Sequence, residues 1–167
     1  LAISLGLAAV TTHAVTTGLA RSGASPRRAE RLLRAAAREQ ALVLASEDEA
    51  ARVVARLRER AIPAIALKGL ASNQVVHAPR AWCRAPGDVD LLVPEEQADE
   101  ARALFADDPA YVAVEDLDAA FYEHHHHLQP FVRRDRPASP VELHRRISGV
   151  TTGNVRIDHA GCWARAI

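Results

Sequence analysis

The first third of the chain alternates apolar and charged residues with the period of a helix. Between residues 25 and 60, apolar side chains recur at spacings of three and four among arginines, at Leu32, Leu33, Ala36 and Ala37. Such spacing places one apolar stripe along a helix whose remaining surface is charged. We therefore expect helical structure here that covers another element with its apolar face.

Serine and proline positions indicate where these helices start. Ser25 is suited to cap a helix whose first residue is Pro26. Ser46 and Glu49 have the spacing of a capping box, which indicates a second helix that begins there and ends before Ile62. The pattern thus predicts two consecutive helices that cover a sheet.

Beyond residue 62 the apolar period becomes that of strands. Short apolar runs bounded by proline, glycine or aspartate predict strands at residues 64–67, 88–93, 111–114, 128–133 and 141–147. Pro137 and Pro140 separate the last two, and helical patterns at 70–76 and 95–105 separate the first three. Strands interleaved with helices predict an α/β (α+β) domain built on one mixed sheet with flanking helices.

The length and composition of the chain fit one globular domain. Its 167 residues are 49% hydrophobic and 25% charged, which argues against disorder. We divide the chain into an N-terminal helical segment, residues 1–61, and an α/β core, residues 62–167. The opening run 1–10 is apolar but shorter than the about 20 residues that span a bilayer, and it lacks the basic start of a signal peptide. We expect it to form a buried or partner-facing helix.

Charge and cysteine usage exclude several functional classes. Lysine plus arginine and aspartate plus glutamate both number 21, so no net charge draws the chain to nucleic acid or to a membrane surface. An aromatic content of 4% argues against a base-stacking platform for single strands. Cys83 and Cys162 have neither disulfide-scaffold nor zinc spacing, which fits a reducing, cytoplasmic setting without a membrane partner.

Asp88 and Asp90 are the sharpest candidates for chemistry. On a strand, alternate side chains share a face, so both carboxylates point the same way, roughly 6.5–7 Å apart, while Val89 and Leu91 face the core. Two such carboxylates repel one another unless a cation lies between them, and Mg²⁺ prefers carboxylate and phosphate oxygens. The short pattern also occurs by chance on solvated strand faces, so alone it leaves function and coincidence open.

A third acid follows the same pattern in the last predicted strand. In the run 141–144, Glu142 and His144 share one face, and their apolar neighbours face the core. On a neighbouring strand, Glu142 would complete a triad able to hold two metal ions about 3.5–4 Å apart. The alternative is an exposed glutamate paired with Arg145 or Arg146.

Basic residues near these acids are candidates for phosphate contacts. Lys68 and Gly69 form a strand-to-helix turn, where glycine allows close approach of the backbone and the lysine adds a charge. The sequence contains no P-loop pattern. Arg84, four residues before Asp88, either meets a phosphate or braces the loop through a salt bridge.

Four consecutive histidines, His124 to His127, suggest a metal ligand. In an extended strand, neighbouring side chains point to opposite faces, so at most two of the four would share a site. We therefore expect adventitious binding of nickel or zinc rather than a dedicated site. His125 or His127 is a candidate to line the pocket opposite Glu142.

These motifs occur together in a way that resembles a known family. The stretch R-A-P-G-D-V-D-L-L-V at residues 84–93, with residues 67–69, His127 and V-E-L-H at 141–144, is similar to motifs of an uncharacterised bacterial nucleotidyltransferase family. That family belongs to the polymerase-β-like superfamily. The resemblance covers residues 62–147, about half of the chain, and implies a nucleotidyltransferase-like core.

The resemblance implies a cofactor, a substrate and three catalytic acids. Members of the superfamily bind Mg²⁺ and a nucleoside triphosphate (NTP) and transfer a nucleotide. Carried over to this sequence, Asp88 and Asp90 would be metal ligands and Glu142 the third acid, which completes the second metal site.

The phosphate-binding part departs from the superfamily. The resemblance places Gly69, with Lys68, at the triphosphate and favours His127 over His125 as a pocket residue. The usual glycine–serine turn is absent, because Leu70 offers no hydroxyl. We also expect the helical C-terminal region of the family to be missing from this chain.

Three functions are compatible with the sequence, and we give them in order of preference. The first is a Mg²⁺-dependent nucleotidyltransferase that moves a nucleoside monophosphate from an NTP to an acceptor hydroxyl. Balanced charge and few aromatic residues favour a small molecule or a protein over nucleic acid as the acceptor. The second is a catalytically inactive nucleotide- or partner-binding module of the same fold, which the missing serine favours. The third is a glycosyltransferase with a D-x-D motif, for which the chain is small.

Overall fold

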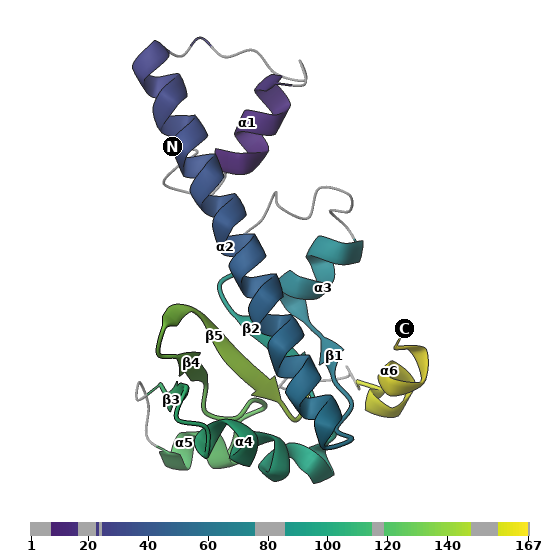
Figure 1. Ribbon diagram of the computed structural model, residues 1–167. Helices are drawn as coiled ribbons and strands as arrows, with labels where there is room; N and C mark the ends of the chain where they lie inside the picture. Colours follow the sequence, from purple (N-terminus) through teal and green to yellow (C-terminus); the bar gives the residue numbers. More distant parts are fainter. Residues whose placement is uncertain are drawn as a thin grey trace.

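A five-stranded mixed sheet forms the centre of the protein (Figure 1). The computed structural model describes residues 8–16, 23, 25–75, 86–114, 119–147 and 157–166. The strands are β1 (Ile65–Ala66), β2 (Val89–Leu92), β3 (Tyr111–Ala113), β4 (Phe131–Arg133) and β5 (Arg136–His144). They lie in the order β1-β2-β5-β4-β3; β2 and β5 are parallel, and the other neighbouring pairs are antiparallel. The expected α/β (α+β) fold with one mixed sheet is confirmed.

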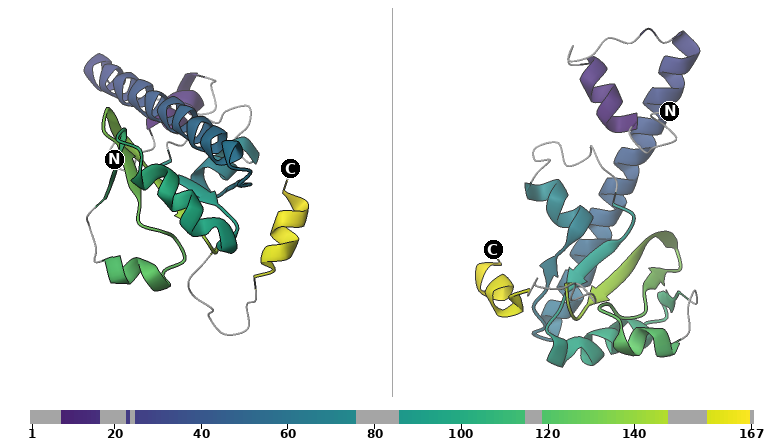
Figure 2. Two further views of the ribbon diagram at one scale, coloured as in Figure 1. Left: turned by 60° about the horizontal axis from the view of Figure 1, so that its bottom comes forward. Right: turned by 180° about the vertical axis from the view of Figure 1, so that it is seen from behind.

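Helices cover the sheet and extend beyond it. They are α1 (Ala8–Thr16), α2 (Pro26–Glu59), α3 (Lys68–Val75), the 3₁₀ turn η2 (Glu95–Gln97), α4 (Ala98–Ala106), α5 (Ala119–His124) and α6 (His159–Arg165). The C-terminal half of α2 lies against the sheet, and its N-terminal half projects away with α1 alongside (Figure 1). Beside α2, α4 contacts β3 and β5, and α6 lies at the periphery (Figure 2). Of these described helices, none combines the length and apolar character that crossing a membrane requires.

The apolar core lies between the sheet and the helices α2 and α4. Apolar residues of the two parallel strands are no more than 1% exposed, namely Val89, Leu91, Val141 and Leu143. They share one cluster with Leu57 of α2. Because strand side chains alternate, the residues between them face the other side of the sheet. The division of the chain at residue 61 stays a prediction, and Leu57 from the N-terminal segment belongs to this core.

The region 25–60 forms one helix instead of the two expected. Since α2 runs unbroken through Ser46, the prediction that Ser46 and Glu49 form a capping box is wrong. The buried Ser46 hydroxyl hydrogen-bonds the Ser139 hydroxyl of β5, with 2.7 Å between the oxygens. Glu49 accepts a hydrogen bond from the Tyr111 hydroxyl and lies 3.5 Å from the Arg133 guanidinium. Both polar side chains make tertiary contacts, which the local spacing does not distinguish from a cap.

The strand β5 is longer than expected, because it begins at Arg136 rather than at residue 141. Pro137 and Pro140 therefore lie inside a strand. The parallel register with β2 begins at Val141, so residues 136–140 have no β2 partner in the described part of the chain. Proline is tolerated in such a stretch because its missing N–H group is not needed for pairing. Of the opening helix expected at 1–10, the structure describes α1 from residue 8 onward. The helices α5 and α6 are not predicted by the sequence patterns.

Candidate functional site

The parallel pairing of β2 and β5 brings two acids side by side. Asp90 and Glu142 are register partners, and alternation places their side chains on the face of the sheet opposite the apolar core. The Asp90 side chain is 1% exposed, and that of Glu142 is 19% exposed. A carboxylate as deeply buried as Asp90 needs charged or hydrogen-bonding partners, because burial disfavours its ionised form.

Lys68 and His144 supply those partners. The Lys68 ammonium nitrogen lies 2.6 Å from Asp90 Oδ1 and 3.6 Å from Glu142 Oε2. The His144 Nε2 atom lies 2.7 Å from the same Asp90 oxygen and 3.6 Å from the same Glu142 oxygen. Lys68 is the single lysine of the chain. One ammonium and one imidazole thus each contact both carboxylates.

Asp88 lies at the entrance to β2 and is half-buried. Burial, together with the neighbouring Asp90 and Glu142 carboxylates, raises the pKa of Asp88 to about 6. Burial and the neighbouring carboxylates thus together disfavour the ionised form of Asp88. We call Asp88, Asp90 and Glu142 together the acidic centre.

The other groups at the acidic centre have pKa shifts that favour their charged forms. Burial acts to raise the pKa of Asp90, but hydrogen bonds from His144 and Lys68 outweigh it and hold that pKa below its ordinary value. The contact with His144 also lowers the pKa of Glu142. In turn, burial acts to lower the pKa of His144 and of Lys68, and their contacts with the carboxylates outweigh it and raise both. The two carboxylates and the two basic side chains, Lys68 and His144, therefore favour one another's charged forms here.

The acidic centre has the donor set of a divalent-cation site. Asp90 Oδ2 is buried and has no hydrogen-bond partner among the described residues. One ligand atom each from Asp90, Glu142 and His144 lie within 4.8 Å of one another. Mg²⁺ prefers carboxylate oxygens, and a buried oxygen without a donor or a cation is costly. The residues present thus fit a divalent cation.

The turn that presents Lys68 is fixed on two sides. The Leu67 N–H group donates to the Asp90 carbonyl over 3.0 Å. Lys68 has a positive φ of 43°, which is unusual for a residue with a side chain. Gly69 is buried against Pro86, and an added Cβ atom would lie 2.9 Å from Pro86 Cβ. This close packing holds the turn beside β2, where the Lys68 side chain reaches the acidic centre.

We expect Gly69→Ala to destabilise the protein by about 1 kcal/mol or more, because the new methyl group overlaps Pro86. Urea unfolding followed by circular dichroism measures the change. Gly87→Ala is the matched control, since an added Cβ there has no atom of the described residues within 4 Å. This control should change the free energy of unfolding by less than about 0.5 kcal/mol. Equal effects of the two substitutions would show that the Gly69–Pro86 contact does not require glycine.

Three of the four consecutive histidines converge, contrary to expectation. The helix α5 ends at His124, the next two residues form a bend, and His127 forms an isolated bridge with His144. The premise of an extended strand, in which at most two histidines share a site, is therefore wrong. One ligand atom each from His125, His126 and His127 lie within 4.8 Å of one another. Burial and the neighbouring rings lower the pKa of His126 to about 4, so its neutral form predominates at neutral pH.

His127, the predicted pocket residue, lies near the acidic centre through His144. The ring centroids of these two histidines are 5.3 Å apart, and His144 in turn contacts Asp90 and Glu142. A role of His127 in nucleotide binding stays a prediction. Arg84, the other predicted phosphate contact, lies in the segment 76–85, outside the described residues.

The two arginines that follow β5 have partners other than the acidic centre. Arg146 pairs with Glu95, with 2.6 Å between nitrogen and oxygen. Arg145 donates to the main-chain carbonyls of Tyr122 and Glu123 over 2.9 and 3.3 Å. In the described structure, Glu142 therefore pairs with neither arginine, so that alternative is wrong.

Comparison with known sequences identifies the family. The model of an uncharacterised nucleotidyltransferase family matches residues 6–167. The chain belongs to this nucleotidyltransferase family. The resemblance expected from the motifs is thereby confirmed, and the match extends it over the N-terminal helices. No curated protein and no solved structure matches the chain.

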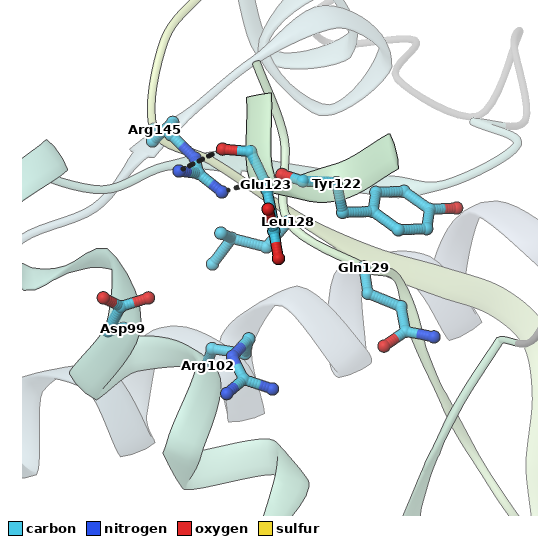
Figure 3. Close-up of a pocket in the computed structure, with 7 residues that line it drawn as sticks. All are labelled: Asp99, Arg102, Tyr122, Glu123, Leu128, Gln129 and Arg145. Atoms are coloured by element: carbon cyan, nitrogen blue, oxygen red, sulfur yellow. Dashed lines mark hydrogen bonds between the residues drawn. The ribbon is translucent and has the colours of Figure 1, made fainter. Parts of the chain in front are cut away.

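One pocket of the protein lies between α4, α5 and the segment after β5 (Figure 3). Its lining residues are Asp99, Arg102, Tyr122, Glu123, Leu128, Gln129 and Arg145. None of Asp88, Asp90 and Glu142 lines it. We therefore do not assign the nucleotide to this pocket, although its surface is concave, because the acids that fit a metal lie elsewhere.

Proposed function

We propose that the protein transfers a nucleoside monophosphate from an NTP to an acceptor hydroxyl in a Mg²⁺-dependent reaction. The observation that carries the proposal is the parallel register that sets Asp90 beside Glu142, with one Asp90 oxygen buried and unpartnered among the described residues. Membership of the nucleotidyltransferase family supports nucleotidyl transfer in general. The metal, the acceptor and the residue roles given below are our proposal.

The reaction joins the acceptor oxygen to the α-phosphorus and breaks the bond to the bridging oxygen, so that pyrophosphate leaves. We assign Asp88, Asp90 and Glu142 as the metal ligands. Mg²⁺ bound there would neutralise negative charge on the phosphoryl oxygens. Glu142 accepts the proton of the acceptor hydroxyl. Because its pKa is low, Glu142 is a weak base, so positioning and charge neutralisation contribute more than proton transfer.

The residues around the acidic centre hold the nucleotide. We assign Lys68 and Gly69 to the triphosphate, because the Lys68 side chain is 49% exposed and reaches the carboxylates that would hold the metal. His144 orients Asp90 through its hydrogen bond. His127 and Arg84 are proposed to contact the nucleotide. As acceptor we propose a small molecule or a protein hydroxyl rather than nucleic acid.

Calorimetric titration with ATP and GTP, with and without Mg²⁺, tests this proposal. We expect wild-type binding that requires Mg²⁺, is reversed by EDTA and is lost in the double variant Asp88→Asn/Asp90→Asn. Asp107→Asn is the control, because Asp107 is exposed at the C-terminal end of α4. Nucleotide binding that survives unchanged in the double variant would contradict the proposal.

Metal binding should weaken as the pH falls through about 6. The Asp88 carboxyl, whose pKa burial raises to about 6, is protonated below that pH and no longer attracts a cation. Since one proton must leave Asp88 for the cation to bind, the affinity for Mn²⁺ should fall by about 10-fold per pH unit below 6. Electron paramagnetic resonance of free Mn²⁺ measures this profile. Asp88→Asn should remove the step, and an identical profile in that variant would refute the assignment.

A non-catalytic nucleotide-binding module of the same fold is the second candidate. It is favoured by the position of the Lys68 ammonium, which contacts Asp90 and Glu142 where a metal would bind. Such a module binds nucleotide without Mg²⁺ and releases no pyrophosphate. A pyrophosphate-release assay with NTP, Mg²⁺ and a panel of small hydroxyl compounds and peptides separates the two candidates.

A further inference from the structure

Three histidines after α5 form a compact group outside the acidic centre. The ring centroids of His125 and His126 are 4.0 Å apart, those of His125 and His127 4.2 Å, and those of His126 and His127 4.9 Å. Phe121 of α5 stacks on the ring of His125, with 4.6 Å between centroids. The bend thus gathers three imidazoles in one place, and we call them the histidine cluster.

The backbone of the histidine cluster is tied to the end of β5. The His126 carbonyl accepts hydrogen bonds from the N–H groups of Arg145 and Arg146 over 2.9 and 3.1 Å. The N–H group of Leu128 donates to the Leu143 carbonyl over 2.8 Å. These bonds fix the backbone of the bend, so the three side chains start from defined positions on it. Such preorganisation is what a metal site requires.

The hydrogen bonds of the rings leave nitrogen atoms available for a metal. His127 Nδ1 lies 2.8 Å from the Leu128 carbonyl and donates to it, which leaves Nε2 as the nitrogen that can bind a metal. A ring that donates to a backbone carbonyl is the usual arrangement of a metal-bound histidine. His126 Nδ1 is buried without a hydrogen-bond partner among the described residues. His125 Nδ1 accepts a long bond of 3.5 Å from the His127 N–H group, which holds that ring weakly.

We propose that His125, His126 and His127 form a binding site for a transition-metal ion such as Zn²⁺. Imidazole nitrogens suit zinc, copper and nickel, whereas Mg²⁺ prefers oxygen ligands. Three histidine ligands leave a fourth position for water or for an anionic group. The site thus differs in chemistry from the acidic centre.

The proposed site lies next to the acidic centre but does not rest on the proposed nucleotidyl transfer. The rings of His126 and His127 are each 5.3 Å from the ring of His144, which contacts Asp90 and Glu142. A metal ion on the histidine cluster would add positive charge close to the place proposed for the triphosphate. It would bind equally in a protein that transfers no nucleotide.

Titration of the full chain with Zn²⁺ alone, in competition with a chromophoric chelator, tests the proposal. We expect a tightly bound ion whose affinity is at least about 10-fold weaker in His126→Ala. His124→Ala is the matched control, because His124 belongs to the same run but is exposed and lies outside the cluster. Glu142→Gln is the second control, and its affinity for Zn²⁺ should stay within about 3-fold of wild type.

Two results would overturn the proposal. If His124→Ala and His126→Ala lose equal affinity, or if both keep it, the run binds an adventitious ion only. If Glu142→Gln releases the ion, Zn²⁺ occupies the acidic centre instead. X-ray absorption of the wild-type zinc complex is independent of how any variant folds. Three imidazole ligands per zinc support the site, and fewer than three refute it.

Discussion

Asp90→Asn is expected to lower metal-dependent nucleotidyl transfer by about 10³-fold or more. The Asp90 side chain is 1% exposed, and its Oδ1 atom contacts both Lys68 and His144. Asparagine keeps the shape of this side chain but removes its negative charge. A cation at the acidic centre then loses a charged ligand, and the charge that develops on the phosphoryl oxygens is no longer neutralised.

Two measurements separate loss of the site from loss of the fold. Mn²⁺ binding, which needs no acceptor, should be at least about 100-fold weaker in Asp90→Asn than in wild type. Thermal unfolding by circular dichroism should remain cooperative. Asp107→Asn, a substitution of the same kind on an exposed residue, should leave both unchanged. Full Mn²⁺ affinity in a folded Asp90→Asn protein would remove Asp90 from the metal site.

The fold could be predicted where a short segment determines its own structure. The apolar run around β2 and the alternation in β5 fix both as strands, because each buries one face or both. The continuity of α2 could not be predicted, since the hydroxyl of Ser46 finds its partner in Ser139, 93 positions further along the chain. The start of β5 could not be predicted, because Pro137 and Pro140 argue against a strand. They are tolerated there because no β2 residue pairs with that stretch in the described structure.

The candidate site could be predicted by residue type but not by arrangement. The acids Asp88, Asp90 and Glu142 are visible in the sequence, yet no local pattern says that Asp90 and Glu142 are register partners. The position of His144 beside Glu142 can be predicted, because residues two apart in a strand have their side chains on the same face. The prediction that at most two of the histidines share a site is wrong because His125 and His126 form a bend, in which side chains do not alternate between two faces.

Lys68→Met is expected to tighten the binding of Mn²⁺ alone by about 10- to 100-fold while it weakens the binding of ATP. The ammonium lies 2.6 Å from Asp90 Oδ1 and 3.6 Å from Glu142 Oε2, so a divalent cation on the same carboxylates meets a like charge. At an effective dielectric constant of about 20, two unit charges about 4 Å apart interact by about 4 kcal/mol. The half-exposed lysine can swing away, which reduces this cost but does not remove it.

When a metal displaces the Lys68 ammonium from the carboxylates, nucleotide binding should be favoured, because the same positive charge is then free to contact a phosphate. Lys68→Arg is the control: it keeps the positive charge, and its Mn²⁺ affinity should stay close to that of wild type. Because Lys68 is the single lysine, reductive ¹³C-methylation labels it apart from the chain terminus, and its resonance should shift on addition of Mg²⁺ and ATP. If Lys68→Met weakens Mn²⁺ binding instead, the ammonium supports the carboxylates rather than competing for them. Effects of opposite sign on metal and nucleotide are therefore the signature of a lysine that alternates between the acidic centre and the triphosphate.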